Sequence, residues 1–83
     1  MVLKIFTQPG CPACPPAKAL AEKLEKKIKV DYIDVSKPEG LEEALKYSVM
    51  STPTLILIDK KVEKIWTVTP SEGEVLQEIE RLK

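Results

Sequence analysis

Short apolar runs alternate with amphipathic segments along the chain, and the two patterns predict strands and helices in turn. Four runs have the length and the β-branched or aliphatic content of strands, namely residues 2–7, 30–35, 55–58 and 62–68. The third run is apolar throughout, which favours an inner strand covered on both faces. Only Asp59 to Lys61 separate it from the fourth run, and so short a connection predicts an antiparallel hairpin.

Three segments carry apolar residues at the three- and four-residue spacing of a helix that buries one face. The first begins near Ala17 and is predicted to have a length of about 16 residues. The second ends near Tyr47, and the third fills the end of the chain. The predicted buried stripes are Ala17, Leu20, Ala21, Leu24 and Ile28 in the first helix, Leu41, Ala44 and Leu45 in the second, and Val75, Leu76, Ile79 and Leu82 in the third.

Two of these helices have a sequence signal for their N-cap, the residue that precedes the first turn. Ser36 and Glu39 have the spacing of a capping box, which predicts Ser36 as the cap of the second helix. Thr69, Pro70 and Glu72 predict Thr69 as the cap of the third. The predicted order is therefore β-α-β-α-β-β-α. Because a helix connects the first two strands, these strands are expected to be parallel.

Composition narrows the class of protein. The 83 residues are 43% hydrophobic and 31% charged, which predicts one globular domain over residues 1–83. The 13 basic residues balance the 13 acidic ones without a block of like charge, so we expect no nucleic-acid and no membrane partner. No apolar run has the length of a membrane span or of a signal-peptide core. We therefore expect a cytoplasmic protein. We also expect it to be a monomer.

Both cysteines fall between the first predicted strand and the first predicted helix. In a reducing compartment, a Cys-x-x-Cys at such a junction is typical of a redox-active dithiol. Cys11 precedes the helix, whose free N–H groups and dipole should lower the pKa of its thiol, so Cys11 is the predicted nucleophile. Cys14 follows one helical turn later and is predicted to be more buried and to act as the resolving thiol. Lys18, one further turn on, would add positive charge near the sulfurs.

Pro15 and Pro16 lie in the first turn of this helix. Neither donates an N–H group, and each disfavours helical geometry in the residue before it, so we predict a distorted first turn. The largest aromatic residues are predicted to pack in the core or at its edge rather than to form a site. These residues are Trp66, Tyr32 and Tyr47.

Other roles for the cysteines stay open at this point. A structural zinc site needs four ligands, and one Cys-x-x-Cys without histidine supplies two per chain, so only a metal between two chains would be complete. A purely structural disulfide would close a loop too short to stabilise the fold much. The alternative function is a non-enzymatic binding module or a metal-bridged dimer. The favoured interpretation has no metal site and no cofactor beyond a redox-active disulfide between Cys11 and Cys14.

The element order, with Cys-Pro-Ala-Cys at residues 11–14 and Thr52-Pro53 before the third strand, resembles the thioredoxin fold over essentially the whole chain. The pattern Cys-Pro-x-Cys-x-x-Ala-Lys over residues 11–18 is similar to glutaredoxins. The length is similar to that of the short glutaredoxin-like thioredoxins of archaea and bacteria. The resemblance implies an α/β fold with a four-stranded mixed sheet and helices on both faces.

The resemblance also implies an activity, the reduction of disulfides in protein substrates, with the two cysteines in the roles given above. It implies that the peptide bond before Pro53 is cis and that the backbone of Thr52 pairs with an extended substrate segment beside Cys11. Pro12 and Ala13, between the cysteines, are then expected to contact the substrate as well.

Two reductants fit the resemblance, a thioredoxin-reductase-like flavoprotein and glutathione. Ala13 stands where glutaredoxins usually have a tyrosine, and residues 7–10 lack the lysine often found before the motif. Residues 67–72 do not match the glycine pair and acidic residue that hold glutathione. These differences favour the flavoprotein. On the thioredoxin side, no tryptophan adjoins the motif, and Ile5 stands at the place of the buried acid.

Overall fold

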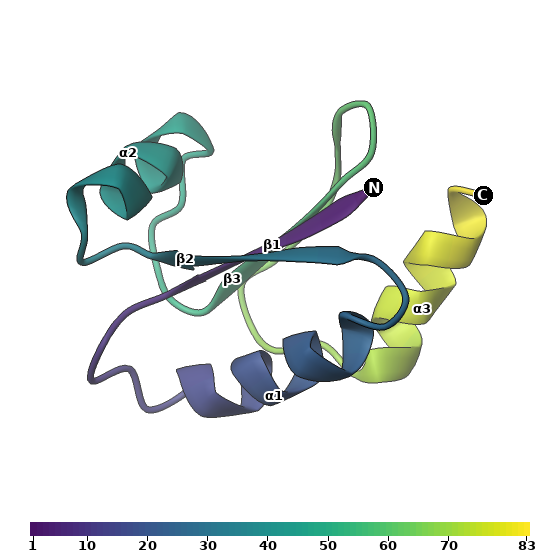
Figure 1. Ribbon diagram of the computed structural model, residues 1–83, viewed down its shortest axis with the longest axis horizontal. Helices are drawn as coiled ribbons and strands as arrows, with labels where there is room; N and C mark the ends of the chain where they lie inside the picture. The colour runs from purple at the N-terminus through teal and green to yellow at the C-terminus, as the bar shows by residue number, and fades with distance from the viewer.

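The structure, a computed structural model, describes all of residues 1–83 and has the predicted order of elements (Figure 1). The elements are β1 (Val2–Thr7), α1 (Cys14–Leu24), β2 (Lys29–Asp34), α2 (Pro38–Lys46), β3 (Thr54–Ile58), β4 (Val62–Trp66) and α3 (Glu72–Arg81). None of the three helices is both long enough and apolar enough to cross a membrane.

The four strands form one mixed sheet in the order β2-β1-β3-β4. β1 and β2 are parallel and β3 and β4 are antiparallel, as the sequence predicts. β1 also pairs with β3 in antiparallel fashion. In the β1–β3 register Phe6 lies opposite Thr54. The start of β3 is therefore beside the end of β1, where the chain leaves the sheet toward the cysteines.

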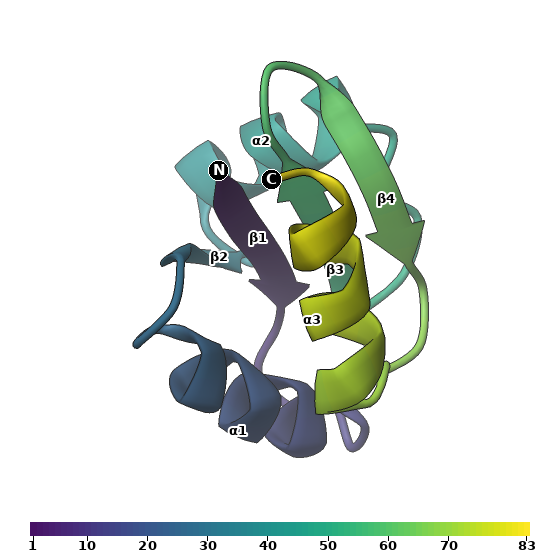
Figure 2. The same cartoon turned by 90° about the vertical axis from the view of Figure 1, so that its right-hand side faces the viewer.

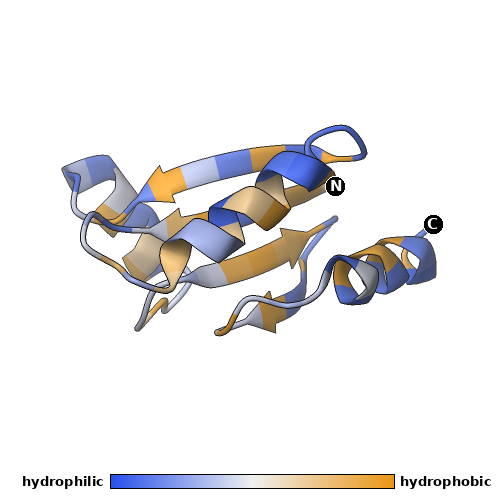
Figure 3. Ribbon diagram, turned by 90° about the horizontal axis from the view of Figure 1, so that it is seen from below, coloured by the Kyte–Doolittle hydropathy of each residue, from blue (hydrophilic) through white to orange (hydrophobic).

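Helices cover both faces of the sheet, with α1 and α3 on one face and α2 on the other (Figures 1 and 2). β3 lies inside this sandwich and is hydrophobic along almost its whole length (Figure 3). The larger core contains Leu3, Ile5, Ala17, Leu20, Ala21, Leu24, Leu55, Leu57, Trp66, Val75 and Ile79. The smaller core, under α2, contains Phe6, Ala44 and Ile56.

α1 differs from the prediction at both ends. It spans 11 residues, Cys14–Leu24, because the chain tightens after Leu24, where the N–H of Lys27 donates to the Leu24 carbonyl at 2.9 Å. Ile28 is outside the helix but still packs against the larger core. At the other end α1 is continuous across Pro15 and Pro16, so the predicted distorted turn is wrong. Both prolines fall in the first turn, where a missing N–H breaks no helical hydrogen bond.

The predicted cap of α2 is wrong. The carboxylate of Asp34 accepts hydrogen bonds from the backbone N–H of Ser36 at 2.9 Å and from its hydroxyl at 2.6 Å. Ser36 is therefore bonded to Asp34, which precedes it in the chain. Lys37 occupies the N-cap position of α2, and its side chain makes no cap hydrogen bond. These hydrogen bonds from Ser36, together with the charges of Lys37 and Lys18, hold the pKa of Asp34 below its ordinary value.

The predicted buried stripe of α2 is also wrong in two of its three residues. Ala44 is buried, but Leu41 and Leu45 are 50% and 70% exposed. Instead, Gly40 is the second buried residue of the helix. A Cβ atom on Gly40 would overlap the backbone carbonyl of Asp34 at the end of β2. The small residues Gly40 and Ala44 therefore face the sheet in α2, and Leu41 and Leu45 stay exposed.

α3 begins two residues later than predicted. Its cap is Ser71, whose hydroxyl accepts the N–H of Glu74 at 3.1 Å, and the Glu74 carboxylate completes a capping box. Thr69 lies before the helix, and β4 also ends early, at Trp66 rather than Val68. Val75 and Ile79 form the buried stripe, and Leu76 and Leu82 pack partly buried beside it.

Lys4 of β1 is a mostly buried cation that joins three elements. Its Nζ lies 3.4 Å from a carboxylate oxygen of Asp31 in β2 and 3.2 Å from one of Glu43 in α2. The centre of the Tyr47 ring lies 5.8 Å from the same Nζ. Burial lowers the pKa of Lys4, but the hydrogen bonds and charges of the two carboxylates outweigh it, so the pKa lies above its ordinary value.

Candidate active site

Two consecutive β-turns lead from β1 into α1. In the first, the N–H of Cys11 donates to the carbonyl of Gln8 at 3.3 Å. Pro9 and Gly10 are its central residues, and Gly10 has φ +82. Proline followed by a residue with positive φ is the pattern of a type II turn, and glycine is the residue that adopts this φ without strain. Nothing would crowd a Cβ atom on Gly10, so its backbone conformation is what requires glycine there.

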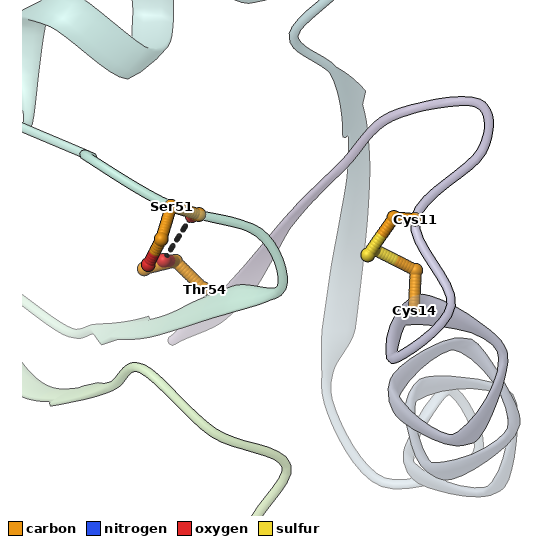
Figure 4. The surroundings of a disulfide bond; sticks show 4 residues. All are labelled: Cys11, Cys14, Ser51 and Thr54. Atoms are coloured by element: carbon orange, nitrogen blue, oxygen red, sulfur yellow. Dashed lines mark hydrogen bonds between the residues drawn. A yellow bond between two sulfur atoms is a disulfide. The ribbon is translucent and has the colours of Figure 1, made fainter.

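The second turn spans the two cysteines. The N–H of Cys14 donates to the carbonyl of Cys11 at 3.3 Å, and Ala13 has φ −95 and ψ −4. These angles, after proline at position 12, are those of a type I turn. The turn brings the Cα atoms of Cys11 and Cys14 to 5.4 Å, within the range that a disulfide bridges. The two sulfurs are joined by a disulfide in the structure (Figure 4).

The two cysteines differ in access. Cys14 is 2% exposed, whereas Cys11 is partly exposed. This difference agrees with the expectation that Cys14 is the more buried cysteine. It arises because Cys14 is the first residue of α1 and lies with Ala17 on the buried face of the helix, while Cys11 lies on the preceding loop.

The electrostatic part of the prediction needs a correction. α1 begins at Cys14 with Ala13 as its N-cap, so Cys11 lies three residues before the first helical residue. Pro15 and Pro16 have no N–H, which removes two of the donors that a helix start normally offers. The expected group of free N–H donors around the Cys11 sulfur is therefore reduced, and the dipole of α1 is the main contribution left.

The second part of the site is the segment between α2 and β3. The Thr52–Pro53 peptide bond is cis, as the resemblance implies. Thr52 is partly exposed and Pro53 is buried. The backbone of residues 50–53 makes no hydrogen bond to any other backbone group. The N–H and carbonyl of Thr52 are therefore without a backbone partner in the chain.

A groove of about 130 Å³ lies beside the Thr52 segment. Gln8, from the loop before Cys11, lines it together with Ser51 and Thr52. Its remaining walls are mostly apolar, and Met50 at its rim is 93% exposed. The other lining residues are Val35, Leu41, Ala44 and Val49.

The remaining predicted site residues are on the surface. Pro12 and Ala13 are exposed at the tip of the type I turn. Lys18 is exposed and lines a different groove with Pro9 and Asp34, and its charge acts on the Asp34 carboxylate. No cluster of three or more histidine, cysteine, aspartate or glutamate side chains is arranged to hold a metal ion.

Sequence reasoning missed two residues of the site. The carbonyl of Gln8 closes the type II turn, and the hydroxyl of Thr54 donates to the carbonyl of Ser51 at 2.7 Å (Figure 4). Pro9-Gly10 is a signal for the type II turn and hence for the role of Gln8. A threonine that opens an apolar strand carries no comparable signal.

Known proteins resemble this chain over most of its length. A family model described as the thioredoxin domain matches residues 1–80. A probable thioredoxin of Archaeoglobus fulgidus is 39% identical, over 100% of this chain and 90% of that protein. A thioredoxin of Methanocaldococcus jannaschii is 34% identical, over 66% of this chain and 67% of that protein.

Solved structures agree with these relatives. Thioredoxin 1 of Thermosipho africanus has a TM-score of 0.74 at 28% identity, over 99% of this chain and 93% of that one. A mutant thioredoxin of Halobacterium salinarum has a TM-score of 0.81 at 26% identity, over 96% of this chain and 72% of that one. The fold, the disulfide between Cys11 and Cys14 and these matches place the chain in the thioredoxin family of thiol–disulfide oxidoreductases, which use a redox-active cysteine pair without a further cofactor.

Proposed function

We propose that this chain is a small electron carrier that reduces disulfides in other proteins, with Cys11 as the nucleophile and Cys14 as the resolving thiol. The observation that carries the proposal is the unequal access of the two bonded cysteines. The attacking sulfur must reach a substrate, whereas the resolving sulfur needs only to reach its neighbour. Cys11 is partly exposed and Cys14 is 2% exposed, which supports this order.

The reaction starts from the reduced dithiol. The Cys11 thiolate attacks one sulfur of the substrate disulfide, forms a mixed disulfide and releases the other substrate sulfur as a thiolate, which takes up a proton. Cys14 loses its proton and attacks the Cys11 sulfur. The mixed disulfide breaks, the second substrate thiol leaves, and the Cys11–Cys14 disulfide forms. Two electrons pass from the chain to the substrate, and a reductant must return two.

Substrate binding in this proposal uses the unpaired backbone of Thr52. An extended segment next to the substrate disulfide pairs with the Thr52 N–H and carbonyl, as an added strand pairs with a sheet edge. Backbone pairing holds the segment without selecting its sequence, which suits a broad class of protein substrates. Pro53 is the platform on which the substrate segment lies, and Pro12 and Ala13 contact the segment from the cysteine turn.

The proposed reductant is a thioredoxin-reductase-like flavoprotein, and the proposed compartment is the cytoplasm, where a reductase keeps dithiols reduced. The names of the two archaeal relatives support a thioredoxin-type partner. Ala13 and residues 67–72, which differ from the glutathione contacts of glutaredoxins, also support it. The Cys-Pro-x-Cys pattern supports placing the chain among the short glutaredoxin-like thioredoxins.

Turnover with the two reducing systems tests the reductant. With insulin as the substrate, NADPH consumption through thioredoxin reductase is expected to be roughly tenfold faster than through glutathione and glutathione reductase, because Ala13 and residues 67–72 do not match the glutathione contacts of glutaredoxins. Both systems are run at the same concentration of this chain, and each is corrected for its rate without the chain. Faster turnover with glutathione would assign the chain to glutaredoxin-type reduction instead.

A further inference from the structure

Thr54 is one of only two buried polar residues in the chain, with 3% of its surface exposed. It is the first residue of β3, and its hydroxyl donates to the carbonyl of Ser51 at 2.7 Å. This hydrogen bond closes the turn of residues 51–54, which contains the proposed substrate-pairing residue Thr52. Figure 4 shows the turn with the disulfide in the same region of the molecule.

No other hydrogen bond reaches residues 51–53 of this turn. The backbone of residues 50–53 has no backbone partner, and Pro53 has no N–H to offer. A loop without internal hydrogen bonds samples many backbone conformations, and ordering it on binding would cost affinity. Thr54 is anchored in the sheet, opposite Phe6 in the β1–β3 register, so its side chain ties the turn to a rigid element.

The position of the turn connects it with the chemistry. Phe6 is the last residue but one of β1, and the loop that follows β1 carries Cys11. Ser51 and Thr52 line the same groove as Gln8, whose carbonyl accepts the Cys11 N–H. A shift of the Ser51 carbonyl would therefore move the Thr52 backbone relative to the Cys11 sulfur.

We propose that the Thr54 hydroxyl is a positioning group that preorganises the Thr52 backbone for an extended protein substrate beside Cys11. This inference rests on the proposed function. It predicts a defect for substrates that need backbone pairing and none for small disulfides that reach the Cys11 sulfur directly. A role in folding alone would affect both kinds of substrate equally.

The test compares Thr54→Val with the wild type on two substrates, insulin and the small aromatic disulfide dithiobis(nitrobenzoic acid). Valine keeps the shape of threonine and removes the donor. We expect the KM for insulin to rise about tenfold with kcat nearly unchanged, the effect of one lost hydrogen bond of ordinary strength. The rate with the small disulfide should stay at the wild-type value.

Two control variants make the result specific. Thr54→Ser keeps the hydroxyl and should restore the wild-type KM for insulin. Ser71→Ala removes another hydrogen bond between a hydroxyl and the backbone, the one that the Ser71 hydroxyl accepts at the cap of α3, outside the groove, and it should leave both rates unchanged. An equal loss on both substrates, an unchanged KM for insulin, or a KM rise in Ser71→Ala would overturn the inference. If the wild-type chain reduces neither substrate, the proposed function fails first.

Discussion

Replacing Cys11 by serine is expected to abolish insulin reduction, whereas replacing Cys14 by serine is expected to leave the chain covalently bound to its substrate. A serine hydroxyl at position 11 is not ionised near neutral pH and does not attack a disulfide. Without the Cys14 sulfur, Cys11 still attacks, but nothing within the chain releases the mixed disulfide. Both variants should therefore lose steady-state turnover to the background rate, for different reasons.

Mass spectrometry of the unreduced mixture distinguishes the two variants. Cys14→Ser should show the mass of this chain plus one insulin molecule, and dithiothreitol should remove the adduct. Cys11→Ser should show no adduct, because Cys14 is only 2% exposed. An adduct on Cys11→Ser with none on Cys14→Ser would reverse the assigned roles.

Replacing Gly40 by alanine is expected to destabilise the fold by about 2–3 kcal/mol, the cost of an overpacked buried contact. Helix propensity alone predicts the opposite sign, a gain of up to about 1 kcal/mol for alanine over glycine inside a helix. The structure decides between them, because a Cβ atom there would overlap the Asp34 carbonyl and lie 3.3 Å from a methyl group of Ile33. The Asp34 carbonyl belongs to the backbone of β2, which has little room to move.

Gly73 provides a matched control within the same chain. It also lies in a helix, α3, but only the Ser71 hydroxyl oxygen, at 3.9 Å, would approach a Cβ atom there. Gly73→Ala is therefore expected to stabilise the chain by about 0.5–1 kcal/mol. Urea unfolding of both variants measures the difference. Equal effects of the two substitutions would show that α2 does not pack closely on β2.

The strands and their order could be predicted from the sequence because apolar runs such as Leu55–Ile58 are uninterrupted and bounded by turn residues. Helix starts could not be fixed in the same way. Two capping signals overlap before α3, one from Thr69 and one from Ser71, and local sequence does not decide between them. The prediction that Ser36 caps α2 is wrong for another reason. The Asp34 carboxylate accepts hydrogen bonds from the Ser36 hydroxyl and N–H.

The packing of α2 could not be predicted from the sequence pattern. Periodicity favours the large residues Leu41 and Leu45 as the buried stripe. The structure buries Gly40 and Ala44 instead, because a helix that approaches a strand end closely needs small residues there. Only the three-dimensional distance between α2 and β2 reveals this.

The candidate site divides in a similar way. Cys11 and Cys14 are evident from their spacing and surroundings, and the resemblance adds Thr52 and Pro53. The hydrogen bond from Thr54 could not be predicted, because it depends on the path of the backbone at Ser51. The cysteine pair could therefore be predicted from the sequence, whereas the contacts that hold the neighbouring backbone in position could not.

In the proposed function, Cys11 and Cys14 form a reversible dithiol–disulfide pair. A redox titration in graded thiol–disulfide buffers, followed by alkylation and mass measurement, tests it most directly. We expect one two-electron transition from zero to two alkylated thiols, at a potential between about −270 and −120 mV, the span of related proteins. Thiols that stay reduced across this range, or a bound metal that protects both of them from alkylation, would contradict it.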